Sequence, residues 1–397
     1  MTNEDKVHQA LNGFQIETPS WGYADTGTRF GKFLQDAAAI TIEDKLSDAS
    51  QVNQFTGCCP RVAVHVLWDF SKDASAIEVR KMAAAHQLEI GSINPNLFQG
   101  QCYKLGSLTH SDAEIREQAI AHCVESVQLA AALDSRVITL WLADGTNYPG
   151  QDNIRKRKRR LHDALGEIHS ELADDQIMLV EYKPFEPAFY HTDIADWGMA
   201  LNYARKAGDK AKVLVDTGHH YAAQNIEQIV AWLLDESMLG GFHFNDRRYA
   251  DDDLTLGSID PYQVFRIFHE IFAYAHDSGG MPAIEYMIDQ SHNLKPKIEA
   301  MIQTVMTAQE LYAKASLVDH ENLARLQQRG EIVDSERLLK HAYDTDVRPL
   351  VNSWRESRGL QSDPLAAFRE SGYHQTIFTE RKKRREEWGV SQASSYA

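Results

Sequence analysis

The sequence has few cysteines and no arrangement of them that suggests a disulfide framework. The four cysteines among 397 residues are Cys58, Cys59, Cys102 and Cys123, and none form a C-x-x-C pair. Adjacent cysteines are poor partners for each other, and sparse unpaired thiols are typical of reduced compartments. We therefore expect free cysteines and a cytoplasmic location.

Long hydrophobic runs are also absent. No stretch approaches the ~20 consecutive apolar residues that a membrane-spanning helix needs. The first 14 residues, MTNEDKVHQALNGF, are polar and lack the basic start and apolar centre of a secretory signal. These two absences predict a soluble protein without a membrane partner.

Acidic residues outnumber basic residues. Lys and Arg number 41 against 57 Asp and Glu, a formal net charge of −16, whereas a surface that neutralises phosphates would be basic. We expect no nucleic-acid partner, and the acidic balance suits a small neutral substrate with divalent cations. The exception is a run of six basic residues, Arg155–Arg160. It could bind phosphate groups, but the overall charge favours a solvated helix face.

Short apolar runs alternate with amphipathic stretches along the first three quarters of the chain. The eight runs, each expected to form a strand, are Phe14–Glu17, Val62–Trp68, Leu88–Ile93, Val137–Trp141, Ile177–Glu181, Val213–Asp216, Gly241–Phe244 and Ala283–Tyr286. The stretches with helical periodicity include Ala113–Ala132, Lys158–Leu172, Asp193–Ala207 and Ile226–Leu234. This alternation indicates an α/β fold with parallel strands, and eight strands close a (β/α)8 TIM barrel. The rival, a doubly wound open sheet, usually has a glycine-rich phosphate turn after its first strand, and none follows here.

The pattern changes after Leu317, where apolar runs give way to helical periodicity. We therefore divide the chain into residues 1–317, a barrel with its site at the C-terminal ends of the strands, and residues 318–397, a helical extension. The extension is expected to serve oligomer assembly, with capping of the barrel bottom as the alternative.

Four successive predicted strands end in side chains that bind hard metal ions. In a (β/α)8 barrel the active site lies at the C-terminal ends of the strands. The candidates at these ends are Glu181, Asp216, His219, His243, Asp251, Asp253 and Asp289. A histidine in a strand or an aspartate after one is common in proteins, but the joint arrangement favours a metal site.

Seven candidate ligands exceed the needs of one ion with open positions, so we expect two divalent ions that share a carboxylate. With Glu181 as the bridge, the first ion is assigned Glu181, Asp216, His243 and Asp289, and the second His219, Asp251 and Asp253. Carboxylates and imidazoles without thiolates favour Mn²⁺, with Co²⁺ or Mg²⁺ as alternatives.

Aromatic and basic side chains near the other strand ends suit a sugar substrate, because flat rings offer apolar walls to its C–H faces. The expected wall residues are Trp21, Phe30 and Trp141, and His65 lies within the second run. Lys183 follows the fifth run, where its ammonium group could polarise a carbonyl or hydroxyl beside the metals. Loop packing for the two aromatic residues of the first loop, and a surface position for Lys183, are the alternatives.

These strand ends resemble those of a known family. The segments VEYKP, VDTGHH, GGFHFND followed by DDDLTLGSID, and IEYMID are similar to the metal-binding strand ends of bacterial L-rhamnose isomerases, in the broad-specificity branch of the xylose isomerase-like barrels. The similarity extends to ETPSWGYADTGTRFG near one end and DPLAAFRESGY near the other. It leaves out the loop that contains Asp246, Arg247 and Arg248.

The resemblance implies an aldose–ketose isomerase that interconverts L-rhamnose and L-rhamnulose in rhamnose metabolism, with Mn²⁺ or a similar ion and assembly as a homotetramer. It implies the same ligand sets, with Glu181 shared between a structural and a catalytic ion. It further implies a substrate contact for Lys183, a position near the sugar ring oxygen for His65, hydrophobic walls from Trp21 and Trp141, and a Phe30 lent to the neighbouring subunit.

The expected chemistry is a two-metal-assisted hydride shift between C1 and C2 of the opened sugar. Asp289, Lys183 and His65 are the expected catalytic residues, with His65 assigned to ring opening or ring-oxygen contact. An enediol route with a carboxylate base is the mechanistic alternative. The functional alternatives are a ketose 3-epimerase, an abasic-site endonuclease on the same barrel, and a non-catalytic sugar- or metal-binding protein.

Overall fold

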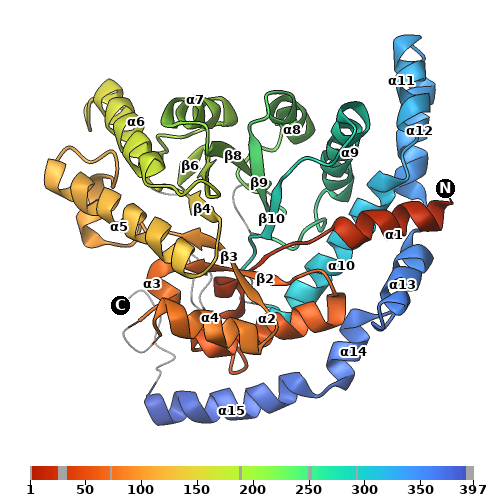
Figure 1. The fold of residues 1–397 in the computed structure, drawn as a ribbon, viewed down its shortest axis with the longest axis horizontal. Helices are drawn as coiled ribbons and strands as arrows, with labels where there is room; N and C mark the ends of the chain where they lie inside the picture. Colours follow the sequence, from red (N-terminus) through yellow and green to blue (C-terminus); the bar gives the residue numbers. More distant parts are fainter. Residues whose placement is uncertain are drawn as a thin grey trace.

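A parallel sheet closed around a central axis forms the centre of the molecule (Figure 1). The computed structural model describes residues 2–25, 34–71, 74–186, 190–248, 253–291 and 294–389. Within them the eight strands of the sheet, in spatial as well as chain order, are β1 (Thr18–Pro19), β2 (Arg61–His65), β3 (Glu89–Asn94), β4 (Val137–Leu140), β5 (Ile177–Glu181), β8 (Ala211–Asp216), β9 (Leu239–Phe244) and β10 (Glu285–Ile288).

Glu17 joins the first and last strands and so closes the barrel. Its backbone N–H donates to Tyr286 O at 2.8 Å, and its carbonyl accepts from Ile288 N at 2.9 Å. Consecutive strands are parallel neighbours around the rest of the ring. The predicted TIM barrel is confirmed.

Helices surround the barrel and connect its strands (Figure 1). They are α2 (Ile42–Thr56), α4 (Ala76–Ala85), α5 (Ala113–Ala132), α6 (Ile154–Ser170), α7 (Trp197–Ala207), α8 (Ile226–Asp235), α9 (Pro261–Ser278) and α10 (Lys297–Ser316). Five of them start behind an Asp or Asn whose side-chain oxygen accepts a backbone N–H of the first turn. These N-caps are Asp112, Asn153, Asp196, Asn225 and Asp260.

Only Ile177–Glu181 has the expected bounds, and three of the other strands differ in ways that matter for the fold. The first strand follows the run Phe14–Glu17 instead of occupying it, and the last lies two residues later than expected. The run Val62–Trp68 is strand only as far as His65, and the chain then turns into the short helix α3 (Val66–Asp69). A continuous apolar run does not reveal such a switch, because a buried strand and a buried helical turn use the same side chains.

The expected solvated basic run is partly structural. Arg157 is buried, with 2% of its surface exposed, and its guanidinium donates to Asp193 Oδ2 at 2.7 Å and to Leu105 O at 3.1 Å. Arg160, half-buried, donates to Asp152 Oδ2 at 3.0 Å. The other four residues of the run are exposed. The run therefore anchors loops through two of its arginines and presents the remaining four to solvent.

The chain beyond the barrel is helical, as expected. Its helices are α11 (His320–Gln328), α12 (Ile332–Asp344), α13 (Arg348–Ser357), α14 (Pro364–Glu370) and α15 (Tyr373–Trp388). Helix α13 packs on α1 (Asn3–Gly13), and α14 packs on α2 and α10, so this part of the extension follows the outside of the barrel (Figure 1). None of the described helices is both long and apolar enough to cross a membrane.

Arginines of α15 fasten the extension to α2 and to the segment after β1. The Arg381 guanidinium, 2% exposed, makes two 2.7 Å contacts with the Asp48 carboxylate and donates to Ala37 O at 2.7 Å. Burial raises the pKa of Asp48 to about 6, although the neighbouring Arg381 acts in the opposite direction. Ala39 in turn donates its N–H to Tyr23 O, which is two residues from Trp21.

We predict that Arg381→Met lowers the free energy of unfolding by about 3–5 kcal/mol, because it leaves the buried Asp48 carboxylate without its partner. The matched control on the same helix is Arg384→Met. Its guanidinium is 32% exposed and pairs with Asp44, so about 1 kcal/mol or less should be lost. Urea unfolding followed by circular dichroism measures both, and equal losses would contradict the prediction.

Candidate metal centre

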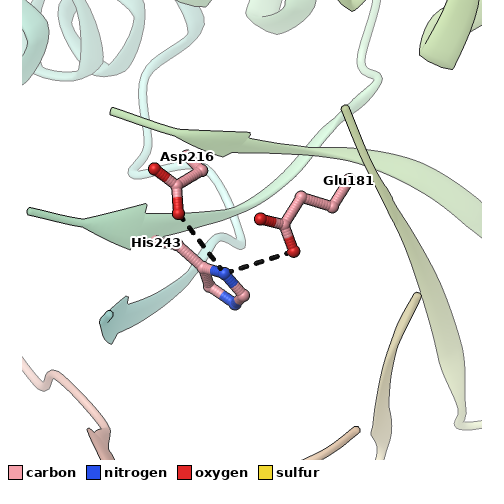
Figure 2. Close-up of side chains that lie close together, drawn as sticks. All are labelled: Glu181, Asp216 and His243. Atoms are coloured by element: carbon pink, nitrogen blue, oxygen red, sulfur yellow. Dashed lines mark ion pairs between the residues drawn. The ribbon is translucent and has the colours of Figure 1, made fainter. Parts of the chain in front are cut away.

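Three acidic or imidazole side chains meet where neighbouring strands end. Glu181 is the last residue of β5, Asp216 the last of β8, and His243 lies one residue before the end of β9. The register of β8 and β9 places Asp216 directly beside His243. His243 Nδ1 lies 3.3 Å from Glu181 Oε2 and 3.8 Å from Asp216 Oδ2 (Figure 2). One ligand atom from each residue lies within 4.8 Å of the others.

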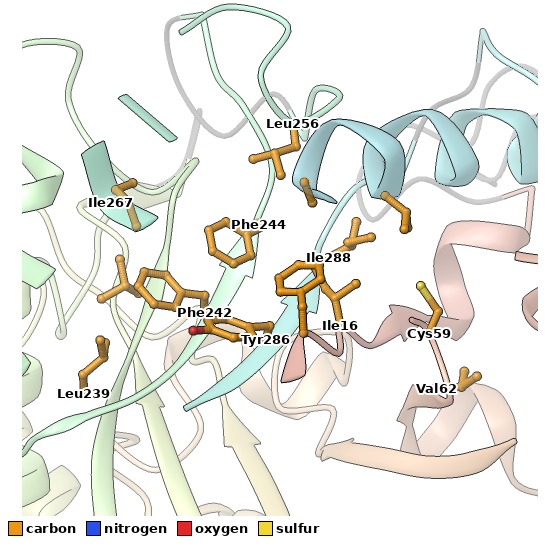
Figure 3. Close-up of a cluster of buried hydrophobic side chains, with 14 of the residues drawn as sticks. Ile16, Cys59, Val62, Leu239, Phe242, Phe244, Leu256, Ile267, Tyr286 and Ile288 are labelled. Carbon is orange, nitrogen blue, oxygen red and sulfur yellow. The ribbon is translucent and has the colours of Figure 1, made fainter. Parts of the chain in front are cut away.

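Strand alternation directs His243 to this point. Successive residues of a strand face opposite sides of the sheet, and Phe242 and Phe244 on either side of His243 pack into the hydrophobic layer outside the barrel (Figure 3). Their rings stack at 4.9 Å, and Tyr286 of β10 packs against both. The two phenylalanines therefore fix the strand face from which the imidazole projects inward.

Several polar atoms of this cluster lack hydrogen-bond partners within the described part of the chain. Asp216 Oδ1 accepts from Gly218 N at 2.7 Å and from Asn245 Nδ2 at 3.0 Å, but Asp216 Oδ2 has no hydrogen-bond partner there. The same holds for both ring nitrogens of His243. Buried polar atoms are nearly always paired, and carboxylate and imidazole atoms are suitable ligands for a divalent cation. Glu181, Asp216 and His243 could therefore bind a metal.

The electrostatics of the cluster favour the binding of a cation. Burial raises the pKa of Glu181 to about 8, opposed by Lys183 and reinforced by Asp253. Burial also raises the pKa of Asp216 to about 7, and Glu181 adds to the shift. The pKa of Asp289 is raised for the same first reason, with the Asp253 charge next. A bound cation would favour the ionised forms of all these carboxylates.

The structure brings two further predicted ligands to the cluster. Asp289 follows β10 directly, and its Oδ2 lies 3.7 Å from His243 Nδ1. His219 lies in the loop after β8, with Nδ1 3.1 Å from Glu181 Oε1 and Nε2 3.9 Å from Asp216 Oδ2. These contacts place Glu181 between the two expected ligand sets.

The remaining two predicted ligands, Asp251 and Asp253, follow β9 in the sequence. Asp253 is near enough for its charge to raise the pKa values of Glu181, Asp216 and Asp289. Its backbone has a φ of +48°, a left-handed conformation that few residues other than glycine adopt. Asp251 lies outside the described residues.

Lys183 is buried beside the cluster, so the surface alternative is wrong. Its side chain is 2% exposed, and Nζ lies 2.7 Å from Glu186 Oε2 of the strand β6 (Phe185–Glu186). Nζ also lies 5.1 Å from the centre of the Trp141 ring system, within the range of a cation–π contact. The ammonium group is therefore held at a defined place at the mouth of the barrel.

Aromatic rings form a wall around His65. Trp21 contacts His65 edge-on at 5.1 Å between ring centres, Trp68 lies at 4.0 Å and Phe98 at 5.7 Å. Trp141 extends the wall, with its ring centre 4.7 Å from that of Phe98. Burial lowers the pKa of His65 to about 3, so the imidazole is neutral at physiological pH.

Trp21 connects this wall to the metal ligands. Its indole Nε1 donates to Asp289 Oδ1 at 3.0 Å, and only 4% of the residue is exposed. Trp21 therefore borders the acidic cluster as well as the aromatic wall. The other predicted aromatic residue of the same loop, Phe30, lies outside the described residues.

Sequence reasoning missed several residues of this site. Trp68 was assigned to a strand, and Phe98 was not considered although it follows β3, where the rule of C-terminal strand ends would have selected it. Asp69 carries no sequence signal, yet it accepts hydrogen bonds from Ser20 Oγ at 2.5 Å, Lys45 Nζ at 2.6 Å and His65 N at 2.8 Å. This buried carboxylate joins Lys45 of α2 to Ser20, which precedes Trp21, and to His65 at the end of β2.

Comparison with known proteins agrees with the fold. The family described as Xylose isomerase-like TIM barrel matches residues 60–273, which is more than half of the chain. The protein belongs to this family.

The names of individual relatives state a reaction class or a substrate. A probable sugar isomerase of Rhizobium meliloti (strain 1021) is 39% identical over 384 residues, which cover 95% of this chain and 88% of that protein. An L-rhamnose isomerase of Yersinia pseudotuberculosis is 27% identical over 183 residues, 43% of each chain. Among solved structures, an L-ribulose 3-epimerase aligns with a TM-score of 0.53 and 14% identity over 77% of this chain and 98% of its own. That last likeness concerns the fold alone.

We predict that His243→Asn weakens Mn²⁺ binding by at least about 100-fold, because loss of a direct ligand should cost more than the 10–100-fold typical of supporting residues. The barrel should remain folded by circular dichroism. The control is His269→Asn, which removes another buried imidazole, on α9, and should leave Mn²⁺ affinity unchanged. Calorimetric titration of metal-free protein measures both, and unchanged affinity in His243→Asn would show that the ion binds elsewhere.

The raised pKa values predict that Mn²⁺ affinity falls as the pH decreases from about 8. Metal-free Glu181 and Asp216, with pKa values of about 8 and about 7, hold protons that a cation must displace, so affinity should change about tenfold per pH unit for each proton released. Because the raised pKa values mean that the folded protein binds these protons more tightly than the unfolded chain, protonation of the two carboxyls stabilises the metal-free fold at low pH. That contribution to stability is lost as the pH rises through the two pKa values. Titrations in buffers of different ionisation enthalpy count the released protons. An affinity independent of pH between 6 and 8 would contradict the prediction.

Proposed function

We propose that the protein is a metal-dependent aldose–ketose isomerase that interconverts L-rhamnose and L-rhamnulose. The observation that carries the proposal is the cluster of Glu181, Asp216 and His243, in which Asp216 Oδ2 and both ring nitrogens of His243 have no hydrogen-bond partner among the described residues. The buried Lys183 and a wall of aromatic rings adjoin this cluster. Family membership and the similarity to a probable sugar isomerase support the reaction class. The strand-end motifs and the partial similarity to an L-rhamnose isomerase support the choice of sugar.

The proposed cofactor is a pair of divalent ions, with Mn²⁺ preferred to Co²⁺ or Mg²⁺. The proposed ligands of the first ion are Glu181, Asp216, His243 and Asp289. Those of the second ion are His219, Asp251 and Asp253, with Glu181 shared between the two ions. Bound there, such ions would act as Lewis acids on the O1 and O2 atoms of an open-chain sugar. Asp289, which touches both Trp21 and His243, would join the metal ligands to the wall of the sugar site.

The chain's own side chains would bind and orient the sugar. The rings of Trp21, Trp68, Phe98 and Trp141 would pack on its C–H faces and exclude water. The Lys183 ammonium, held by Glu186, would donate a hydrogen bond to a sugar oxygen and stabilise negative charge that develops there. Neutral His65 would serve as a hydrogen-bond partner for the ring oxygen.

Further proposals concern the chain as a whole. We place residues 1–317 in a catalytic barrel and assign residues 318–397 to subunit assembly, with a homotetramer as the expected form and Phe30 completing the neighbour's site. We further propose a cytoplasmic enzyme of rhamnose metabolism without a nucleic-acid partner. The net charge of −16 counts against an abasic-site endonuclease, which would need a basic surface for DNA.

The test is an assay of metal-free protein restored with Mn²⁺, Co²⁺ or Mg²⁺. We predict ketose formation from L-rhamnose that requires metal, and weaker turnover of L-mannose and L-lyxose, which add a hydroxyl at C6 or lack that carbon. Lys183→Met should lower kcat by about 100–1,000-fold, the usual effect of removing one stabilising donor. Turnover of D-fructose to its C3 epimer with no action on any aldose would instead identify a ketose 3-epimerase.

The same assay in D₂O distinguishes the two routes. A hydride shift between C1 and C2 keeps the migrating hydrogen, so the ketose should contain little solvent deuterium at C1. Substantial deuterium there would favour an enediol and a carboxylate base.

A further inference from the structure

Arg247 lies behind the metal centre and donates to three backbone carbonyls of one loop. It follows β9 by three residues and is 8% exposed. Its Nε donates to His220 O at 2.6 Å, Nη1 to Thr217 O at 3.0 Å and Nη2 to Tyr221 O at 3.0 Å. A planar guanidinium is the side chain that can satisfy several carbonyls at fixed directions at once.

The loop held in this way, residues 217–221, carries His219 and has no regular secondary structure. Its first residue is anchored independently, because Thr217 exchanges hydrogen bonds with Asn245 through Oγ1. Beyond Thr217, Arg247 holds the backbone of the loop through His220 O and Tyr221 O. The guanidinium therefore fixes the part of the loop that follows His219.

The opposite side of the loop faces the acidic cluster. His219 Nδ1 lies 3.1 Å both from Tyr182 O and from Glu181 Oε1. Its neighbour His220 meets the Tyr182 hydroxyl at 2.7 Å through Nε2. The direction of the His219 ring thus depends on a loop whose backbone carbonyls are held by Arg247.

The residue before Arg247 acts in the same way on the second loop. Asp246 accepts from Ile259 N at 2.8 Å and Asp260 N at 3.1 Å, and its backbone pairs with that of Leu254. It therefore fixes the stretch that begins at Asp253. The chain that leaves β9 holds both loops assigned to the second ion.

We propose that Arg247 is a positioning residue for His219, and through it for the second divalent ion. The inference rests on the two-ion arrangement of the proposed function. It assigns a role to a loop that the family resemblance leaves out. In a purely structural role, Arg247 would affect stability and leave the relative affinities of two ions unchanged.

The experiment compares Arg247→Met with Arg355→Met in the full-length protein. Arg355, on α13 of the helical extension, is another buried arginine, 2% exposed, that donates to Ser362 O at 3.1 Å and to Gln309 Oε1 of α10 at 2.6 Å. Both variants lose a buried guanidinium, but only the first lies behind His219. Mn²⁺ is titrated calorimetrically into each metal-free protein, and a crystal structure of metal-free Arg247→Met is determined.

We expect Arg247→Met to bind the first Mn²⁺ as the wild type does and the second 10–100-fold more weakly, the usual effect of losing a supporting residue. In the crystal, the His219 ring should have left Glu181. Arg355→Met should lower the melting temperature and keep both affinities. Arg247→Lys, which retains the charge but not the fork of donors, should recover part of the second affinity, and it replaces Arg247→Met if that variant does not fold.

Wild-type affinity for both ions in Arg247→Met, or in Arg247→Lys where only that variant folds, would overturn the inference. So would a wild-type chain that binds a single Mn²⁺, because the loop would then have no second ion to position. Failure of the proposed function has a different signature. If the wild type converts no aldose, the isomerase proposal is refuted. If Arg247→Met nevertheless loses only the affinity for the second Mn²⁺, the positioning role of Arg247 stands.

Discussion

Burial of like charges at the mouth of the barrel is the constraint on which the surrounding structure depends. Glu181 and Asp216 are 3% and 0% exposed, and Asp253 and Asp289 add to the same negative region. Desolvation and repulsion make such a cluster unfavourable unless a cation compensates it. Gly218 N and Asn245 Nδ2 hold the Asp216 carboxylate in place without carrying a charge that would neutralise it. The stability of this region and its capacity to bind metal are therefore two aspects of one charge arrangement.

Two levels of support hold the candidate ligands. Glu181, Asp216 and His243 lie on strands, so the register of the sheet sets their separation and the packing of Phe242 and Phe244 sets the direction of the imidazole. His219 and Asp253 lie on loops. The backbone of these loops is held by the side chains of Arg247 and Asp246, which follow β9. Strand-borne groups move only if the barrel moves, whereas loop-borne groups depend on individual hydrogen bonds. Glu181 therefore lies between candidate ligands fixed by the strands, Asp216 and His243, and candidate ligands that depend on loop hydrogen bonds, His219 and Asp253.

The sequence was sufficient for the barrel and for most of the candidate ligands because both follow from local patterns. Eight apolar runs predict eight strands, and the C-terminal strand rule selects Glu181, Asp216, His243 and Asp289 without knowledge of any contact. The aromatic wall around His65 was harder to predict, since Trp68 belongs to a helical turn that no periodicity separates from the preceding strand. Asp69 and Arg157 could not be found, because their partners lie far along the chain and a lone charge gives no sign of burial. Local pattern predicts which strand ends carry chemistry, while pairing between distant segments decides what supports them.

The contact between Arg381 of α15 and Ala37, in the segment after β1, has a consequence for the order of folding. The hydrogen bond from Arg381 to Ala37 O spans 344 positions of the chain, and contacts of such separation form late because the intervening chain must be ordered first. During synthesis, α15 emerges after every strand of the barrel, so a nascent barrel already holds its acidic ligands while the segment beside Trp21 still lacks its anchor. The anchor that Arg381 provides to the segment after β1 can therefore form only once α15 has been translated.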